Sequence, residues 1–256
     1  SGPSGGYNFG NKRQYRRIVW NYLEKDIGIP IKERKVFILD SKEAAETLFL
    51  LRRGYAARNI HVANNNPAEV ATVQMRVTAA GFSRVNTFGV DASRALASSY
   101  KSGVFLDSIN LDFCSNINDR TLDNLKTIGD VLPDIVRISI AILKGRETIE
   151  SWRLTRDAYN LNYEANRAGI LSRAAMIISQ LTGDVGKYKA ACLYHAIDER
   201  THQYLSSNGQ MMLVLMCKLV AHTAVLTNRD YLLDMHRRCG RVQMQPGLLT
   251  WMPPCL

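Results

Sequence analysis

The chain opens with a helical pattern of apolar residues. Within residues 12–26, the side chains of Tyr15, Val19, Tyr22 and Leu23 recur on one helical stripe, and the basic residues lie mostly off it. This spacing predicts an amphipathic helix that lies on a sheet and exposes a positively charged face.

Short apolar runs then alternate with stretches of helical spacing. Ser41 and Asp91 are candidate N-caps, and Pro67 suits a first helical position. Gly54 and Gly81 follow expected helix ends. The regular alternation predicts a parallel, right-handed, doubly wound sheet. The expected strands are residues 35–40, 59–63, 84–89, 104–111 and 134–143, and the expected helices are residues 41–53, 68–80, 92–101 and 119–132.

The alternation stops after residue 143. Residues 147–181 predict one long or broken helix, with Gly169 as the break. Residues 188–197 and 210–220 are apolar strands whose connection is too short for a crossover helix, so they should pair antiparallel. We therefore predict an α/β fold: a three-layer, Rossmann-like sheet of seven strands, five parallel followed by an antiparallel pair.

This pattern divides the chain into three parts. The chain opens with the small, flexible residues SGPSGG, so we expect residues 1–10 to be a flexible N-terminus and residues 11–225 to form the α/β domain. Residues 226–256 form a C-terminal extension that either packs on the domain or reaches a partner chain. The oligomeric state is left open.

Basic residues are in large excess. The 33 Lys and Arg residues against 23 Asp and Glu residues give a formal net charge of +10, with clusters at residues 12–13, 16–17, 32–35, 52–53 and 237–238. Such a surplus favours a polyanionic partner, and nucleic acid, DNA or RNA, is the commonest one. A basic balance also occurs in proteins without such a partner.

Several other classes of protein are disfavoured. No apolar run reaches the roughly 18 to 20 residues of a membrane span, and no signal pattern opens the chain, so we expect an intracellular protein, cytoplasmic or nuclear, without a membrane partner. The five cysteines are scattered and argue against a disulfide framework. Cys192 and His195 are spaced to face opposite sides of a strand, so no metal site is expected.

Polar residues follow four of the expected strands where each strand ends. Ligands of open α/β sheets bind outside the carboxyl ends of the strands, so these positions are candidate sites. Each position also has a local explanation, because such residues cap helices and form turns. The residues are Asp40 and Ser41, Asn64 and Asn65, Asp91, and Asp112 with Phe113.

Over roughly residues 12–220, this order of elements resembles the class I S-adenosylmethionine-dependent methyltransferase fold, whose seventh strand is antiparallel. The resemblance implies S-adenosylmethionine as cofactor, with Asp40 and Ser41 near its amino acid part. Asn64 and Asn65 stand where the family has an acid that binds the ribose hydroxyls. Asp91 matches an acid that faces the adenine amino group.

The loop after the first expected strand also departs from the family. The family has a glycine-rich turn after its first strand, but Ser41-Lys42-Glu43 follows here. Either a divergent loop holds the cofactor, or the pocket no longer binds it.

The segment Asp112-Phe113-Cys114-Ser115 resembles a loose form of the Asp-Pro-Pro-Tyr motif of amino-methylating enzymes. That resemblance implies that Asp112 accepts a hydrogen bond from the target amine and that Phe113 stacks on an extruded base. The leading hypothesis is therefore methyl transfer from S-adenosylmethionine to a base amine of a nucleic acid.

Two alternatives remain open. Lys12, Asp112, Lys144 and Glu199 occur in the order of the Lys-Asp-Lys-Glu set of RNA ribose methyltransferases, in which the second lysine, here Lys144, deprotonates the hydroxyl. The other alternative is a catalytically inactive methyltransferase-like domain that serves as a basic nucleic-acid-binding or assembly module.

Overall fold

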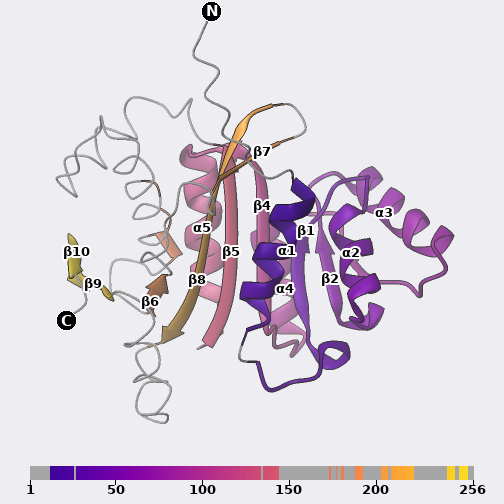
Figure 1. Cartoon of the computed structure of the whole chain (residues 1–256), viewed down its shortest axis with the longest axis horizontal. Coiled ribbons are helices and arrows are strands. Elements are labelled where there is room, and N and C mark those ends of the chain that lie inside the picture. Colours follow the sequence, from indigo (N-terminus) through magenta and orange to yellow (C-terminus); the bar gives the residue numbers. More distant parts are fainter. Residues whose placement is uncertain are drawn as a thin grey trace, which may run out of the picture.

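The structure is a computed structural model of the 256-residue chain. It describes residues 12–25, 27–133, 135–143, 173, 177, 180–181, 188–192, 203–206, 209–221, 241–245 and 248–252. Within these residues a mixed β-sheet carries helices on both faces (Figure 1).

Five parallel strands form one side of the sheet in the order β3-β2-β1-β4-β5. The chain runs outward from β1 to β3 and then returns to place β4 on the other side of β1. This reversal of strand order makes a switch point between β1 and β4, where doubly wound folds bind ligands. The strands are β1 (Val36–Leu39), β2 (Ile60–Ala63), β3 (Asn86–Phe88), β4 (Ser108–Asn116) and β5 (Ile135–Leu143).

An antiparallel pair follows on the other side of β5. Strand β8 (Met211–Ala221) pairs antiparallel with β5, and β6 (Tyr188–Cys192) pairs antiparallel with β8. The predicted α/β fold class, five parallel strands followed by an antiparallel pair, is therefore confirmed. The arrangement is also that of the fold which the resemblance implies.

Alternating side chains of the strands build two apolar cores. Val36 and Ile38 of β1 face a core shared with α1 (Lys12–Leu23), α2 (Ala45–Arg53) and α3 (Pro67–Ala79). Phe37, between them, faces the opposite core with α4 (Ala92–Lys101) and α5 (Asp119–Val131). The period of two along a strand dictates this division.

Helix ends follow the sequence signals, with one exception. Asp91 and Asn118 accept hydrogen bonds from backbone N–H groups as the N-caps of α4 and α5, and Gly54 ends α2 with a φ of 103°. Ser41 does not cap α2. Ala44 is its N-cap residue, in a left-handed conformation (φ 52°) that a Cβ disfavours.

Two other expectations were wrong in detail. Strand β4 begins at Ser108 and continues to Asn116, whereas the sequence predicted residues 104–111. Its pairing with β5 shifts register between Asp112 and Asn116, so the polar residues lie within an irregular strand. Strands β7 (Gln203–Leu205), β9 (Arg241–Gln245) and β10 (Leu248–Met252) were not predicted.

These additional strands extend the sheet. β7 pairs antiparallel with β8, and β9 and β10 lie beyond β6 at the sheet edge, within the expected C-terminal extension. The expected helix over residues 147–181 lies mostly outside the described residues. None of the described helices is long and apolar enough to span a membrane.

Candidate functional site

Asp112 lies at the switch point of the sheet, at the carboxyl end of the parallel strands. In the β1–β4 register Ile38 lies opposite Asn110, so Asp112 stands level with Asp40, the residue that follows β1. Both side chains face the side of the sheet that carries α1 and α2, because residues two apart on a strand share a face.

The Asp112 carboxylate has a partner on each oxygen. Lys12 Nζ lies 2.6 Å from Oδ2, and the Tyr204 hydroxyl donates to Oδ1 at 3.2 Å. Asp112 is 17% exposed at its side chain and Lys12 is 46% exposed, so the ion pair lies at the rim of the domain, within reach of a ligand from solvent. Lys12 is in the first turn of α1, where the helix dipole disfavours a cation, and the Asp112 carboxylate offsets this effect.

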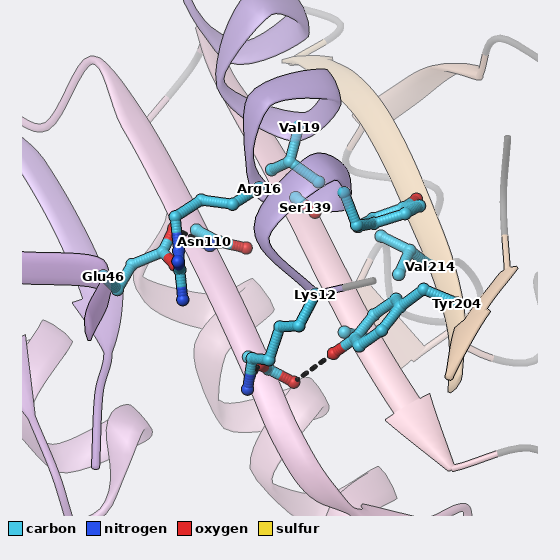
Figure 2. A pocket seen from close by; sticks show the side chains of 11 residues that line it. Lys12, Arg16, Val19, Glu46, Asn110, Ser139, Tyr204 and Val214 are labelled. Atoms are coloured by element: carbon cyan, nitrogen blue, oxygen red, sulfur yellow. Dashed lines mark hydrogen bonds and ion pairs between the residues drawn. The ribbon is translucent and has the colours of Figure 1, made fainter. Parts of the chain in front are cut away.

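A small cavity lined by both polar and apolar side chains lies beneath the N-terminal half of α1. Asn110 and Asp112 of β4 and Ser139 of β5 form part of its floor, and Lys12 and Tyr15 of α1 cover it. Figure 2 shows Arg16, Glu46 and Asn110 gathered on one side of this cavity and Lys12 beside Tyr204 on another. The cavity volume is about 20 Å³, which is enough for a water molecule but too small for an adenosyl group.

Two hydroxyl groups in this cavity have no hydrogen-bond partner among the described residues. They are the Tyr15 hydroxyl and Ser139 Oγ, and both residues are buried. Burial raises the pKa of Tyr15 above its ordinary value, so this hydroxyl stays protonated and available as a donor. A bound water molecule would satisfy such groups.

Glu46 forms the inner wall of the cavity. Its buried carboxylate accepts hydrogen bonds from Arg16 Nε and Trp20 Nε1 of α1, and from Asn110 Nδ2 of β4 at 3.0 Å. The sequence prediction missed Glu46 as a site residue. An acid on the buried face of α2 was the signal that could have identified it.

Asp40 and Asn64 hold the loops that follow β1 and β2. The Asp40 carboxylate accepts from Thr47 N at 2.8 Å, Thr47 Oγ1 at 2.7 Å and Ser41 N at 2.9 Å. Asn64 Nδ2 donates to the Asp40 backbone oxygen at 2.8 Å and to Glu69 Oε2 at 3.0 Å. Burial raises the pKa of Asp40 to about 6.

Asp91 belongs to a different set of contacts. Its carboxylate accepts from Ser93 Oγ at 2.6 Å and from Arg94 N at 3.0 Å, at the start of α4. Burial acts to raise the pKa of Asp91, but these hydrogen bonds and the Arg94 charge hold the pKa below its ordinary value. Ser41 and Asn65 are exposed. Ser41 Oγ accepts a weak local hydrogen bond from Glu43 N, and the Asn65 side chain has no hydrogen-bond partner among the described residues.

The structure therefore unites some of the predicted site residues and separates others. Asp40 and Asn64 follow the neighbouring strands β1 and β2, and Asp112 lies within β4, level with Asp40. Phe113 packs against the core of α4 and α5, whereas Asp112 lines the cavity beneath α1. The two residues lie on opposite faces because β4 continues past them as a strand, contrary to the expected break at Asp112. Lys144 and Glu199 lie outside the described residues.

No three His, Cys, Asp or Glu side chains form a metal-binding cluster in the part of the chain that the structure describes. No family model matches the sequence, and no curated protein matches it.

Several solved structures are similar to the chain. An O-methyltransferase from Bacillus cereus in complex with S-adenosylhomocysteine is 10% identical, with a TM-score of 0.49 and 82% of each chain covered. Magnesium protoporphyrin IX methyltransferase from Synechocystis, with S-adenosylmethionine bound, is 11% identical, with a TM-score of 0.48. The similarity covers 82% of this chain and 79% of that chain. An rRNA methylase from Streptococcus thermophilus is 10% identical, with a TM-score of 0.43. The similarity covers 81% of this chain and 95% of that chain.

Proposed function

We propose that the protein transfers a methyl group from S-adenosylmethionine to a ribose hydroxyl of a nucleic acid. The observation that carries this proposal is the Lys12–Asp112 ion pair of 2.6 Å at the switch point of the sheet. Lys12 and Asp112 are the first two members of the Lys-Asp-Lys-Glu set that the sequence offers, and they come from segments 100 residues apart.

The contacts of Asp112 favour a hydroxyl acceptor over an amine. An amine acceptor needs a carboxylate and a stacking ring on the same face of the sheet, but Asp112 already accepts from Lys12 and Tyr204. Phe113 faces the other side of the sheet. A hydroxyl acceptor instead needs a positioned base, a role that a neutral lysine performs.

In this mechanism the residues of the chain orient the acceptor and remove its proton. Asp112 fixes the Lys12 ammonium group, which donates a hydrogen bond to the acceptor ribose. Lys144 takes the hydroxyl proton as the carbon–oxygen bond forms. When bound, S-adenosylmethionine supplies an electrophilic methyl group whose bond to sulfur breaks, and S-adenosylhomocysteine is the second product.

We assign the residues at the strand ends different roles toward the cofactor. Asp40 and Asn64 shape the loops after β1 and β2, because their side chains are engaged there. Ser41 and Asn65, whose side chains are exposed, would hold the amino acid part and the ribose. Asp91, which also caps α4, would face the adenine. Ala44 supports this reading, because its left-handed conformation gives the loop a glycine-like turn without a glycine.

The basic charge supports a nucleic acid as the acceptor. Arg13 and Arg17 are exposed on α1, the helix that also carries Lys12, and α1 has no acidic residue in its first turn. Such side chains can bind phosphates close to the Lys12–Asp112 pair, and their contribution to affinity falls as salt concentration rises.

A second candidate function is a binding module without methyl transfer. The engagement of Asp40 and Asn64 within their own loops and the absence of glycine between β1 and α2 favour it. In this case the sheet binds nucleic acid through its charge alone.

Calorimetry with S-adenosylmethionine and S-adenosylhomocysteine separates the two candidates. We expect micromolar binding of both ligands, weakened at least tenfold by Asp91→Ala, with Asp123→Ala on the exposed side of α5 as control. No heat at millimolar ligand would refute the enzyme and leave the module. Nucleoside analysis of methylated RNA should then find the methyl group on ribose, and a methylated base would refute the hydroxyl acceptor.

A further inference from the structure

Three sets of contacts connect the helix that carries Lys12 with β4. Near the C-terminal end of α1, Ser108 Oγ of β4 donates to the Leu23 backbone oxygen at 3.0 Å. In the middle, Arg16 and Trp20 of α1 meet Asn110 of β4 through the Glu46 carboxylate. At the N-terminal end, Lys12 meets Asp112.

The spacing of these contacts follows from the geometry of a helix and a strand. Four residues of helix rise about 6 Å, and two residues of strand rise about 6.6 Å. Arg16 is four residues from Lys12, and Asn110 is two residues from Asp112, so this step along α1 matches the corresponding step along β4. Arg16 is therefore the next cation on the face of α1 that carries Lys12, one helical turn further from Asp112.

Two cations on the same face of α1 thus meet two carboxylates. The Arg16 and Glu46 side chains are 11% and 10% exposed, so water screens their charges weakly. An Arg16 guanidinium without Glu46 would be a nearly buried cation without a counter-charge, which is strongly unfavourable. The next carboxylate along the register is Asp112.

Glu46 is suited to bind Arg16 and also to stay fixed. Trp20 Nε1 and Asn110 Nδ2 both donate to Oε1, while Arg16 Nε donates to Oε2. The tryptophan and asparagine therefore hold the carboxylate in place independently of the arginine.

We propose that Glu46 is a positioning residue that retains Arg16 and thereby reserves Asp112 for Lys12. This inference rests on the function proposed above. Without the Glu46 charge, Arg16 competes with Lys12 for Asp112, and the Lys12 ammonium group is displaced from the acceptor.

The test is Glu46→Gln, which keeps the shape of the side chain and an acceptor oxygen for Trp20. We expect kcat for methyl transfer to fall at least tenfold and KM for RNA to stay within twofold. Glu24→Gln is the matched control, because Glu24 is also a poorly exposed carboxylate that accepts from an arginine, Arg53, and an aromatic donor, Tyr55. It should leave kcat within twofold.

A rescue variant separates charge competition from simple structural damage. The double variant Arg16→Met with Glu46→Gln removes the competing cation and retains the acceptor for Trp20. We expect kcat to return to within threefold of the wild-type value. A Glu46→Gln variant with kcat within twofold of wild type would overturn the proposal, and so would a double variant as slow as Glu46→Gln.

A measurement of stability keeps this inference separate from the enzymatic proposal. A double-mutant cycle with Lys12→Met and Asp112→Asn, measured by urea unfolding, gives the coupling between the two side chains. For an exposed ion pair, this coupling changes the folding equilibrium constant by about 1.4-fold to 5-fold. We expect this coupling to vanish in the Glu46→Gln background and to return when Arg16→Met is added. If the wild-type protein lacks methyl transfer, the function fails but this result still decides the role of Glu46. Unchanged coupling in the Glu46→Gln background would overturn that role.

Discussion

Titration of Asp40 should cost stability as the pH rises from 4 to 7. Burial is the largest influence and raises the pKa of Asp40 to about 6 from its ordinary value of 3.8, against hydrogen bonds from Thr47 and Ser41 that favour the carboxylate. The folded chain therefore holds this proton more tightly than the unfolded chain. The stability that the protonated group contributes is complete below pH 3.8 and is lost as the pH rises through 6.

The magnitude follows from the two pKa values of Asp40. The difference between about 6 and 3.8 corresponds to about 3 kcal/mol at 1.36 kcal/mol per pKa unit. The Asp40 side chain is partly exposed, and solvent screening reduces this energy, so we expect about 1–2 kcal/mol.

The assay compares wild type with Asp40→Asn, which keeps the side-chain shape and removes the titration. Urea unfolding at pH values from 4 to 7 gives the free energy of unfolding of both proteins, and their difference cancels groups that titrate equally in both. We expect the wild type to lose about 1–2 kcal/mol relative to Asp40→Asn over this range. A difference that is constant, or that changes in favour of the wild type as the pH rises, would refute the reasoning.

Three further predictions concern stability. Burial lowers the pKa of His61 to about 4 from its ordinary value of 6.5. The stability that the neutral imidazole contributes to the fold is therefore lost as the pH falls from 6.5 to 4, and His61→Phe should abolish this loss in urea unfolding. Gly129 of α5 lies against the Leu181 carbonyl, and a Cβ at position 129 would overlap that carbonyl. Gly129→Ala should therefore lower the free energy of unfolding by about 1–3 kcal/mol, although alanine has the better helix propensity. A variant more stable than the wild type would contradict this packing. Asn118→Ala removes the N-cap of α5 and should cost about 1 kcal/mol, whereas Asn124→Ala within the same helix should cost clearly less.

Local patterns were sufficient to predict the framework of the fold. The alternation of apolar runs and helical stripes reflects contacts within one element, and caps such as Asp91 use donors within three residues. The reversal of direction at β8 followed from the short connection before it. These features depend on neighbours in the sequence, so the sequence predicts them.

The contents of the site depend on contacts between distant segments. An acid such as Asp112 normally marks the end of a buried strand, but β4 continues to Asn116. Lys12, 100 residues earlier, and Tyr204, 92 residues later, supply the partners of the Asp112 carboxylate. Glu46 interrupts the apolar stripe of α2, and its donors on α1 and β4 are visible only in the folded chain. Alternation within β4 separates Asp112 from Phe113, which a predicted loop would have left together.

The role of the Lys12–Asp112 pair in methyl transfer is tested by the single-turnover rate of methyl transfer to RNA, measured for wild type and for Asp112→Asn. Saturating S-adenosylmethionine and matched occupancy of the cofactor, checked by calorimetry, exclude differences in binding. We expect S-adenosylmethionine-dependent methylation of ribose by the wild type. The rate in the variant should be lower by about 100-fold or more, as for loss of a preorganised electrostatic group. A variant as fast as the wild type would contradict this role.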